Sequence, residues 1–172
     1  MKICIAGITE DSIVDGPGLR MAVFVQGCPH HCPGCHNPET HDPNGGQLMD
    51  TTEIIAKMDS NPLLDGITLS GGEPLFQPLA CMELAKAAHE RGLSVWCYTG
   101  YRWEYMLDVY RADTTGVLVG HLDVLVDGPY IESRRTLELP WRGSKNQRLI
   151  DVQASLAAGK TVEYKSGTSK EE

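Results

Sequence analysis

The sequence GCPHHCPGCHNP, residues 27–38, holds Cys28, Cys32 and Cys35 in a C-x3-C-x2-C pattern on one short stretch. The chain starts without the long apolar run of a secretory signal and has no run of about 18–20 apolar residues that would cross a membrane. We therefore expect a cytoplasmic protein that does not contact membranes, a setting in which disulfides are not the default use of cysteine. A tight cysteine cluster in such a protein is typical of a metal site.

Two kinds of metal site compete for this loop. Zinc takes four ligands, and His30, His31, His36 and His41 are close enough in sequence to supply the fourth. Zinc ligands, however, usually come as two pairs on separate elements. Three thiolates on one loop suit a cuboidal iron–sulfur cluster whose fourth iron has no protein ligand, and an open coordination position is typical of a catalytic metal. The spacing favours the cluster and leaves zinc as the alternative.

The size and charge of the chain limit the remaining possibilities. It has 172 residues, a mass of 18.8 kDa and a formal net charge of −8. We expect a single domain over residues 1–158 and a flexible tail over residues 159–172. Binding to nucleic acid needs clustered basic residues, so direct contact with nucleic acid is not expected. Cys4, Cys81 and Cys97 lie in apolar patterns and are expected to be small buried side chains.

The apolar pattern predicts an α/β fold. Strands are expected at residues 2–6, 21–26, 66–70, 93–98 and 122–127. Helices are expected after an N-cap at Asp50, from Pro78 to a stop at Gly92, and over residues 103–110. This alternation predicts parallel strands with helical crossovers. A closed eight-fold barrel typically needs about 250 residues. We therefore expect a partial, open β/α barrel or a curved sheet.

Four unusual segments each follow a predicted strand. They are the cysteine loop, residues 71–74 (GGEP), residues 99–101 (TGY) and residues 128–130 (GPY). Because the carboxyl ends of parallel strands share one edge of a sheet, these segments are expected to meet there and form the active site. Asp127, the last residue of its predicted strand, is a candidate site residue for the same reason.

The cysteine pattern after one strand and GGEP after a later strand together resemble the radical S-adenosylmethionine enzymes. The resemblance implies that Cys28, Cys32 and Cys35 bind a [4Fe–4S] cluster and that S-adenosylmethionine binds its fourth iron. A reduced cluster would then cleave the sulfonium to a 5′-deoxyadenosyl radical. The implied contacts of the cofactor are Gly34, Cys35, His36, Gly71, Gly72 and Glu73. We expect glycine at 71 and 72 because the backbone there approaches the ligand too closely for a Cβ atom.

Further segments resemble the glycyl-radical-enzyme activases, and among them the activases of anaerobic ribonucleoside-triphosphate reductase. They are residues 15–20 (DGPGLR), 99–101, 124–128 (VLVDG) and 141–148 (WRGSKNQR), and the resemblance runs from about residue 13 to residue 150. It implies an oxidoreductase that abstracts a hydrogen from a glycine of the reductase, its protein substrate, with a low-potential electron donor such as flavodoxin.

The same resemblance suggests where the reductase would touch the chain. The candidate contacts are Asp15, Gly16, Pro17, Gly18 and Asp127. Arg20, which follows them, is interpreted as a surface charge. Residues 141–148 could bind the partner or fasten the last strand.

One position departs from the wider superfamily pattern, which has an aromatic residue just before the third cysteine. Here that residue is Gly34, so contact with adenine must come from His36, from the backbone or from another loop. Two other functions remain open. The chain could act on another glycyl-radical enzyme or a small molecule by the same chemistry, or it could be a zinc-stabilised binding module without catalytic activity.

Overall fold

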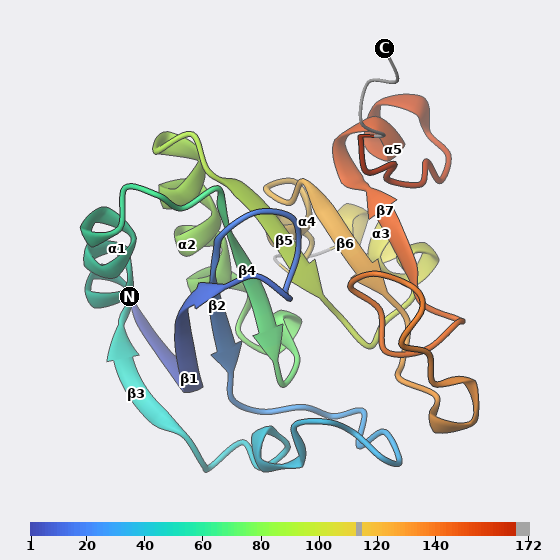
Figure 1. Cartoon of the computed structure of the whole chain (residues 1–172), viewed down its shortest axis with the longest axis horizontal. Helices are drawn as coiled ribbons and strands as arrows, with labels where there is room; N and C mark the ends of the chain where they lie inside the picture. The colour runs from blue at the N-terminus through green and yellow to red at the C-terminus, as the bar shows by residue number, and fades with distance from the viewer. Residues whose placement is uncertain (113–114, 168–172) are drawn as a thin grey trace.

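The computed structural model describes residues 1–112 and 115–167 and shows one mixed sheet (Figure 1). Its strands are β1 (Lys2–Ser12), β2 (Arg20–Val25), β3 (Gln47–Asp50), β4 (Gly66–Gly71), β5 (Ser94–Tyr98), β6 (Val124–Asp127) and β7 (Arg148–Asp151). Within the described residues the sheet has seven strands in the order β3-β1-β2-β4-β5-β6-β7.

The centre of the sheet is parallel and its two edges are antiparallel. β2, β4, β5 and β6 pair in parallel, as the sequence predicted. β1 runs antiparallel to β2, β3 runs antiparallel to β1, and β7 runs antiparallel to β6. The fold is therefore mixed α/β, and the expectation of parallel strands is confirmed only for its centre. β3 and β7 were not predicted, because each has only four residues and too few positions to show a period.

Three helices begin where the sequence predicted them, and two short ones, over residues 115–119 and 152–158, were not predicted. They are α1 (Thr51–Ser60), α2 (Pro78–Glu90), α3 (Trp103–Ala112), α4 (Thr115–Val119) and α5 (Val152–Ala158), with short 3-10 turns at Pro38–Thr40 (η1), Pro74–Phe76 (η2) and Glu132–Arg134 (η3). Asp50 caps α1 in a complete capping box with Glu53, which confirms the predicted start. Gly92 follows α2 with a positive φ of 72°, a conformation that favours glycine.

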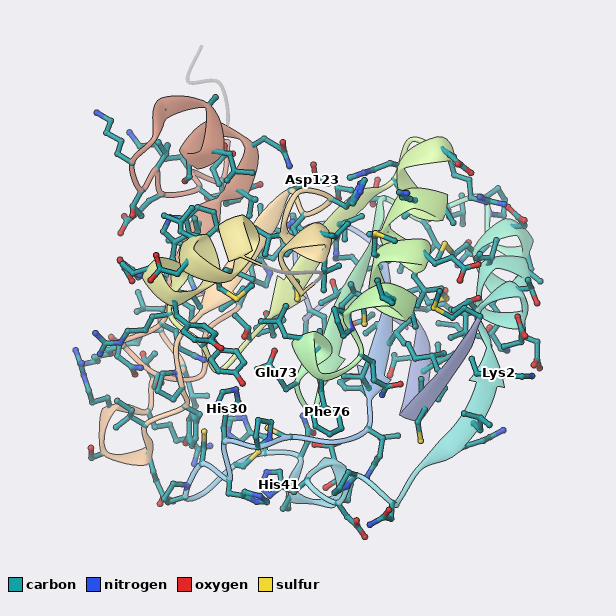
Figure 2. The ribbon with its side chains drawn as sticks, turned by 180° about the vertical axis from the view of Figure 1, so that it is seen from behind. Lys2, His30, His41, Glu73, Phe76 and Asp123 are labelled. Carbon is teal, nitrogen blue, oxygen red and sulfur yellow. The ribbon has the colours of Figure 1, made fainter. Side chains whose placement is uncertain are left out.

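Apolar packing holds α1, α2, α3 and α4 against one face of the sheet, the face toward the viewer in Figure 2, whereas α5 lies beyond the end of β7 (Figure 1). Ile54 of α1 and Leu84 of α2 pack with Ile67 of β4 in the main core, and all three are fully buried. Cys81 and Cys97 are buried in the same core, as expected, whereas Cys4 is only partly buried. Among the described helices, none is long and apolar enough to cross a membrane.

The opposite face of the sheet carries a second, smaller hydrophobic cluster around Trp96. The start of the expected tail packs against this cluster. After α5 ends at Gly159, which adopts a left-handed conformation, the chain turns back along β7. The backbone N–H of Tyr164 donates to the carbonyl of Leu149 at 2.8 Å, and the Tyr164 ring lies 5.2 Å from that of Trp96. The expected tail therefore begins by pairing with the sheet, and its end, residues 168–172, lies outside the described residues. The single-domain boundary at residue 158 stays a prediction.

Candidate functional site

A cavity of about 810 Å³ lies at the carboxyl ends of the parallel strands. Each of the four predicted loops contributes to its wall, with Cys28 after β2, Gly72 after β4, Gly100 after β5 and Tyr130 after β6. The convergence of these loops at one edge of the sheet is therefore confirmed. The β1–β2 loop and residues 135–143 complete the rim.

The three predicted cysteine ligands all face this cavity. Cys28, Cys32 and Cys35 are free thiols of intermediate exposure. Backbone hydrogen bonds fix the start of the loop, because the N–H of Gly27 donates to the carbonyl of Thr40 at 2.8 Å and that of Cys28 to His41 at 3.3 Å. The N–H of Cys35 donates to the carbonyl of Cys32 at 3.0 Å, which closes a turn around the last two thiols. The cysteine loop is thus shaped by the chain itself.

The donor set of this cavity fits an iron–sulfur cluster, because three cysteine thiols line it together. Within residues 1–112 and 115–167, no three His, Cys, Asp or Glu side chains are gathered around a single ion position. A cuboidal cluster does not require such a grouping, because each of three irons takes one thiolate. Partial burial raises the pKa of the Cys28 thiol above its usual value, and iron coordination would offset this by binding the thiolate directly.

Glu73 does not line the cavity, although the resemblance implied that it contacts the cofactor. Its side chain is 1% exposed and lies beneath the loops. The carboxylate accepts hydrogen bonds from His30 Nε2 at 2.7 Å, from Thr99 Oγ1 at 2.9 Å and from the Gly100 N–H at 2.9 Å. Figure 2 shows His30 on the cysteine loop close to Glu73. Glu73 therefore joins the cysteine loop to the loop after β5, which sequence spacing alone could not reveal.

Gly71 and Gly72 line the cavity, and packing within the protein gives a further reason for glycine at both positions. Gly71 has a φ of 92°, and a Cβ atom there would lie 2.7 Å from the backbone of Phe24. A Cβ atom at Gly72 would collide with the carbonyl oxygen of Gly27, the neighbouring residue in space. The N–H of Gly72 donates to the carbonyl of Val25 at 2.8 Å. Close approach of two chain segments therefore requires glycine at both positions.

Gly34 also proves to be a packing glycine and does not line the cavity. Its φ is 75°, and a Cβ atom would lie 2.6 Å from the carboxyl carbon of Glu132. The aromatic surface on this side comes from His36 and Tyr130, whose ring centroids are 4.8 Å apart and which both line the cavity. Of the alternatives for adenine contact, the structure brings His36 to the cavity and adds Tyr130. Sequence reasoning placed Tyr130 on the rim but did not single it out as a site residue.

The DGPG segment contributes one residue to the cavity wall. Asp15 lines the cavity, its carboxylate accepts from the Ser12 hydroxyl, and its carbonyl accepts from Thr68 Oγ1 at 2.6 Å. Gly16, Pro17 and Gly18, also expected to contact the partner, do not line the cavity. They form the turn that presents Asp15.

Arg20 is fully buried, so its interpretation as a surface charge is wrong. Its guanidinium donates to Thr68 Oγ1 at 2.8 Å and to the carbonyls of Ile67 and Pro17 at 2.7 and 3.2 Å. Burial lowers the pKa of Arg20 to about 10. Its bond to the Pro17 carbonyl holds the DGPG turn in place. Most of these acceptors belong to residues distant in the chain, so the neighbours of Arg20 in sequence do not indicate its burial.

Asp127 is also buried and lies outside the cavity. Its carboxylate accepts from Arg148 Nη2 at 2.6 Å and from the Trp103 N–H at 2.9 Å. It is thus held between α3 and β7, beside a second cavity. The structure does not bring Asp127 to the cysteine loop.

The fold and the site together define an α/β iron–sulfur protein, in which one loop at the end of a parallel strand presents three thiols to an open cavity. A family model described as a 4Fe-4S single cluster domain matches residues 14–150. The chain is 36% identical over 142 residues to the anaerobic ribonucleoside-triphosphate reductase-activating protein of Enterobacteria phage T4, a match that covers 79% of this chain and 86% of that protein. The protein of the same name from Escherichia coli K12 is 38% identical over 144 residues, which cover 78% of this chain and 90% of that protein. The chain belongs to the family of anaerobic ribonucleoside-triphosphate reductase-activating proteins.

A more distant relative has a related name. The pyruvate formate-lyase-activating enzyme of Clostridium pasteurianum is 39% identical over 94 residues, which cover 52% of this chain and 40% of that enzyme. These matches agree with the expected cofactors, a [4Fe–4S] cluster and S-adenosylmethionine, and with an oxidoreductase that generates radicals.

Proposed function

We propose that this protein cleaves S-adenosylmethionine reductively and abstracts a hydrogen atom from a glycine of anaerobic ribonucleoside-triphosphate reductase, so that a glycyl radical remains on the reductase. The observation that carries the proposal is the placement of Cys28, Cys32 and Cys35 in the wall of one cavity at the ends of parallel strands. The curved sheet would be the partial β/α barrel of the radical S-adenosylmethionine type. The protein would work in the cytoplasm without contacting membranes or nucleic acid, and a flavodoxin-like donor would supply its electron.

The chain's own residues would hold and orient the two cofactors. The three thiolates would bind three irons of the cluster, and the fourth iron would face the cavity. When bound, the cluster and S-adenosylmethionine supply a one-electron cleavage that produces a hydrogen-abstracting radical. Gly71 and Gly72 would offer backbone to the methionine end, while Gly34 and Cys35 would shape the turn and His36 would lie beside the adenine with Tyr130. Glu73 would fix the position of the cysteine loop relative to these groups.

The rim of the cavity suits a protein substrate. Ile13, Val14 and Leu137 are 75%, 72% and 88% exposed and lie at its edge. Apolar side chains exposed together around an opening are typical of a protein contact site. A docked reductase loop would cover them and exclude water from the radical. Asp15 would border the incoming glycine segment, with Gly16, Pro17 and Gly18 setting its position.

The proposal is tested with the cluster-loaded protein under anaerobic conditions. Iron and sulfide are measured first, because a colourless protein with one zinc and no sulfide would contradict it and favour the zinc-stabilised module. The reduced protein is then incubated with S-adenosylmethionine and the reductase, and 5′-deoxyadenosine and the electron paramagnetic resonance signal are recorded. We expect cofactor cleavage together with a glycyl radical on the reductase.

The match to a pyruvate formate-lyase-activating enzyme supplies the second candidate substrate. The same assay is therefore repeated with pyruvate formate-lyase in place of the reductase. A radical on the lyase and none on the reductase would show that pyruvate formate-lyase is the substrate of this protein. Cleavage without a radical on either protein would favour a small-molecule substrate.

A further inference from the structure

Residues 134–148 concentrate positive charge in an acidic protein. This segment holds five cations and one carboxylate, Glu138, whereas the whole chain has a formal net charge of −8. Part of the segment lines a second cavity of about 340 Å³, and Arg102, just before α3, lines the same cavity. The charge is therefore gathered in space as well as in sequence.

Most of this charge has no internal partner. Arg148 is neutralised, since it pairs with Asp127 at 2.6 Å and with Glu104 at 3.0 Å. Arg102, Arg134 and Lys145 are exposed, and none of them forms an ion pair within the part of the chain that the structure describes. We call these three residues the basic face. Structural stability does not explain them, because their charges point to solvent.

The segment forms a wall between the two cavities. Arg134 lines the second cavity, whereas its neighbour Arg135 lines the first and pairs with Ser144 in an isolated antiparallel bridge. The turn before this wall contacts the cysteine loop, through Tyr130 against His36. One side of the wall thus faces the first cavity, and the basic face lies on the other side, at the second cavity.

A short stack of rings also connects this surface to the cysteine loop. The ring of His30, which lies between Cys28 and Cys32 in sequence, is 4.4 Å from the ring of Tyr101 in an edge-on contact. Tyr105 stacks on Tyr101 with 4.6 Å between centroids and is 49% exposed. The surface of α3 beside the basic face is therefore two ring contacts from the residues that would hold the cluster.

We propose that the basic face is the docking surface for an acidic, low-potential electron-carrier protein. The inference rests on the proposed function, in which the cluster passes from the +2 to the +1 state and the carrier loses one electron. Opposite charges steer two proteins into the correct encounter and raise the association rate. The reductase is the less suitable occupant, because its glycine must enter the first cavity, and the basic face lies on the other side of the wall. The carrier and the reductase thus use separate surfaces.

The test compares two double charge reversals in the cluster-loaded protein. Arg134→Glu with Lys145→Glu changes the basic face. Lys86→Glu with Lys160→Glu makes the same change in net charge at exposed residues that form no ion pair among the described residues and line neither cavity. Purified flavodoxin, reduced to its hydroquinone, is the carrier, and the rate of cluster reduction is followed by stopped-flow absorbance at low and high salt. Binding of oxidised flavodoxin is measured by calorimetry.

At low salt we expect the basic-face variant to be reduced at least about tenfold more slowly and to bind flavodoxin more weakly, within the range of electrostatic steering. The control should behave like the unchanged protein, and high salt should remove the difference. Photoreduced 5-deazariboflavin, which is small and uncharged, should reduce both variants equally and support equal cleavage of S-adenosylmethionine.

Equal flavodoxin rates and affinities in the two variants would overturn the docking surface. The same holds if the basic-face variant loses affinity for the reductase while flavodoxin still reduces it normally. Failure of the proposed function gives a different result, because the unchanged protein would then show no cofactor cleavage even with 5-deazariboflavin.

Discussion

The imidazole of His30 donates from Nε2 to Oε2 of Glu73 across 2.7 Å, and this bond joins the cysteine loop to the GGEP segment. The two residues are 43 positions apart in sequence. Glu73 also accepts from Thr99 and Gly100, so a single carboxylate holds three loops together at the cavity. The geometry of the cluster site therefore depends on a residue that does not touch the cavity.

Replacing Glu73 with Gln should loosen the cysteine loop. The Leu75 N–H also donates to this carboxylate at 3.2 Å, so four protein donors converge on it. An amide has one acceptor oxygen and adds donors there, so about 2–3 kcal/mol of stability is expected to be lost. Urea unfolding of the cluster-free protein and iron content after reconstitution measure the two effects. Glu39→Gln, an exposed carboxylate on η1, is the matched control. Equal stability of the two variants would contradict the role of Glu73.

Replacing Cys32 with Ala should abolish stable cluster binding, because two thiolates hold a cuboidal cluster poorly. We expect sulfide and iron contents near zero and no cleavage of S-adenosylmethionine. Cys4→Ala, at a partly buried cysteine outside the loop, should keep both. A Cys32→Ala protein that still cleaves the cofactor would show that Cys32 is not a ligand.

Replacing Gly72 with Ala should destabilise the protein even without cofactors, since the new Cβ atom would meet the carbonyl of Gly27. Overpacking of this kind costs about 1–3 kcal/mol. Gly7→Ala is the control, because nothing lies within 4 Å of a Cβ atom there. Chemical denaturation of the cluster-free proteins distinguishes the explanations. If only cofactor binding changed, the glycine would serve the ligand rather than the packing.

Replacing Tyr130 with Ala should raise the KM for S-adenosylmethionine, because the aromatic surface beside His36 is removed. A stacking contact contributes about 0.5–1.5 kcal/mol, so the expected increase is about two- to thirteenfold. Tyr130→Phe keeps the ring and should restore the KM. The cofactor-cleavage assay at varied cofactor concentration checks this, and an unchanged KM in the alanine variant would place adenine elsewhere.

Asp50 should make the stability of the protein sensitive to acid. Hydrogen bonds from the Thr52 backbone and hydroxyl lower the pKa of Asp50 from 3.8 to about 2. Because the folded pKa lies below the unfolded value, the contribution is complete above about pH 4 and is lost as the pH falls through about 2. Asp50→Asn keeps a capping side chain without this titration.

The free energy of unfolding is measured from pH 5 to pH 2 to test this. The curve of Asp50→Asn should be flatter than that of the unchanged protein in the acidic range. Asp108→Asn, at an exposed residue of α3, serves as the control. Parallel curves for the Asp50 variant and the unchanged protein would contradict the prediction.

Local signals predicted the centre of the fold well. The capping box at Asp50 and the loops after four apolar runs depend on neighbours in sequence, so spacing reveals them. The burial of Arg20 and the role of Glu73 depend on partners 26 to 74 positions away, which only the folded chain brings together. β7 was missed for a similar reason, since a four-residue edge strand is defined by its pairing with β6.

The cysteine loop is fixed by its own backbone bonds and by Glu73, so most of its ordering entropy is lost when the chain folds and not when iron binds. Where the ligands of a small metal site are disordered without metal, the free energy of metal binding has to offset their ordering. In this chain the folded protein orders the loop, so the free energy of cluster binding does not have to offset that cost.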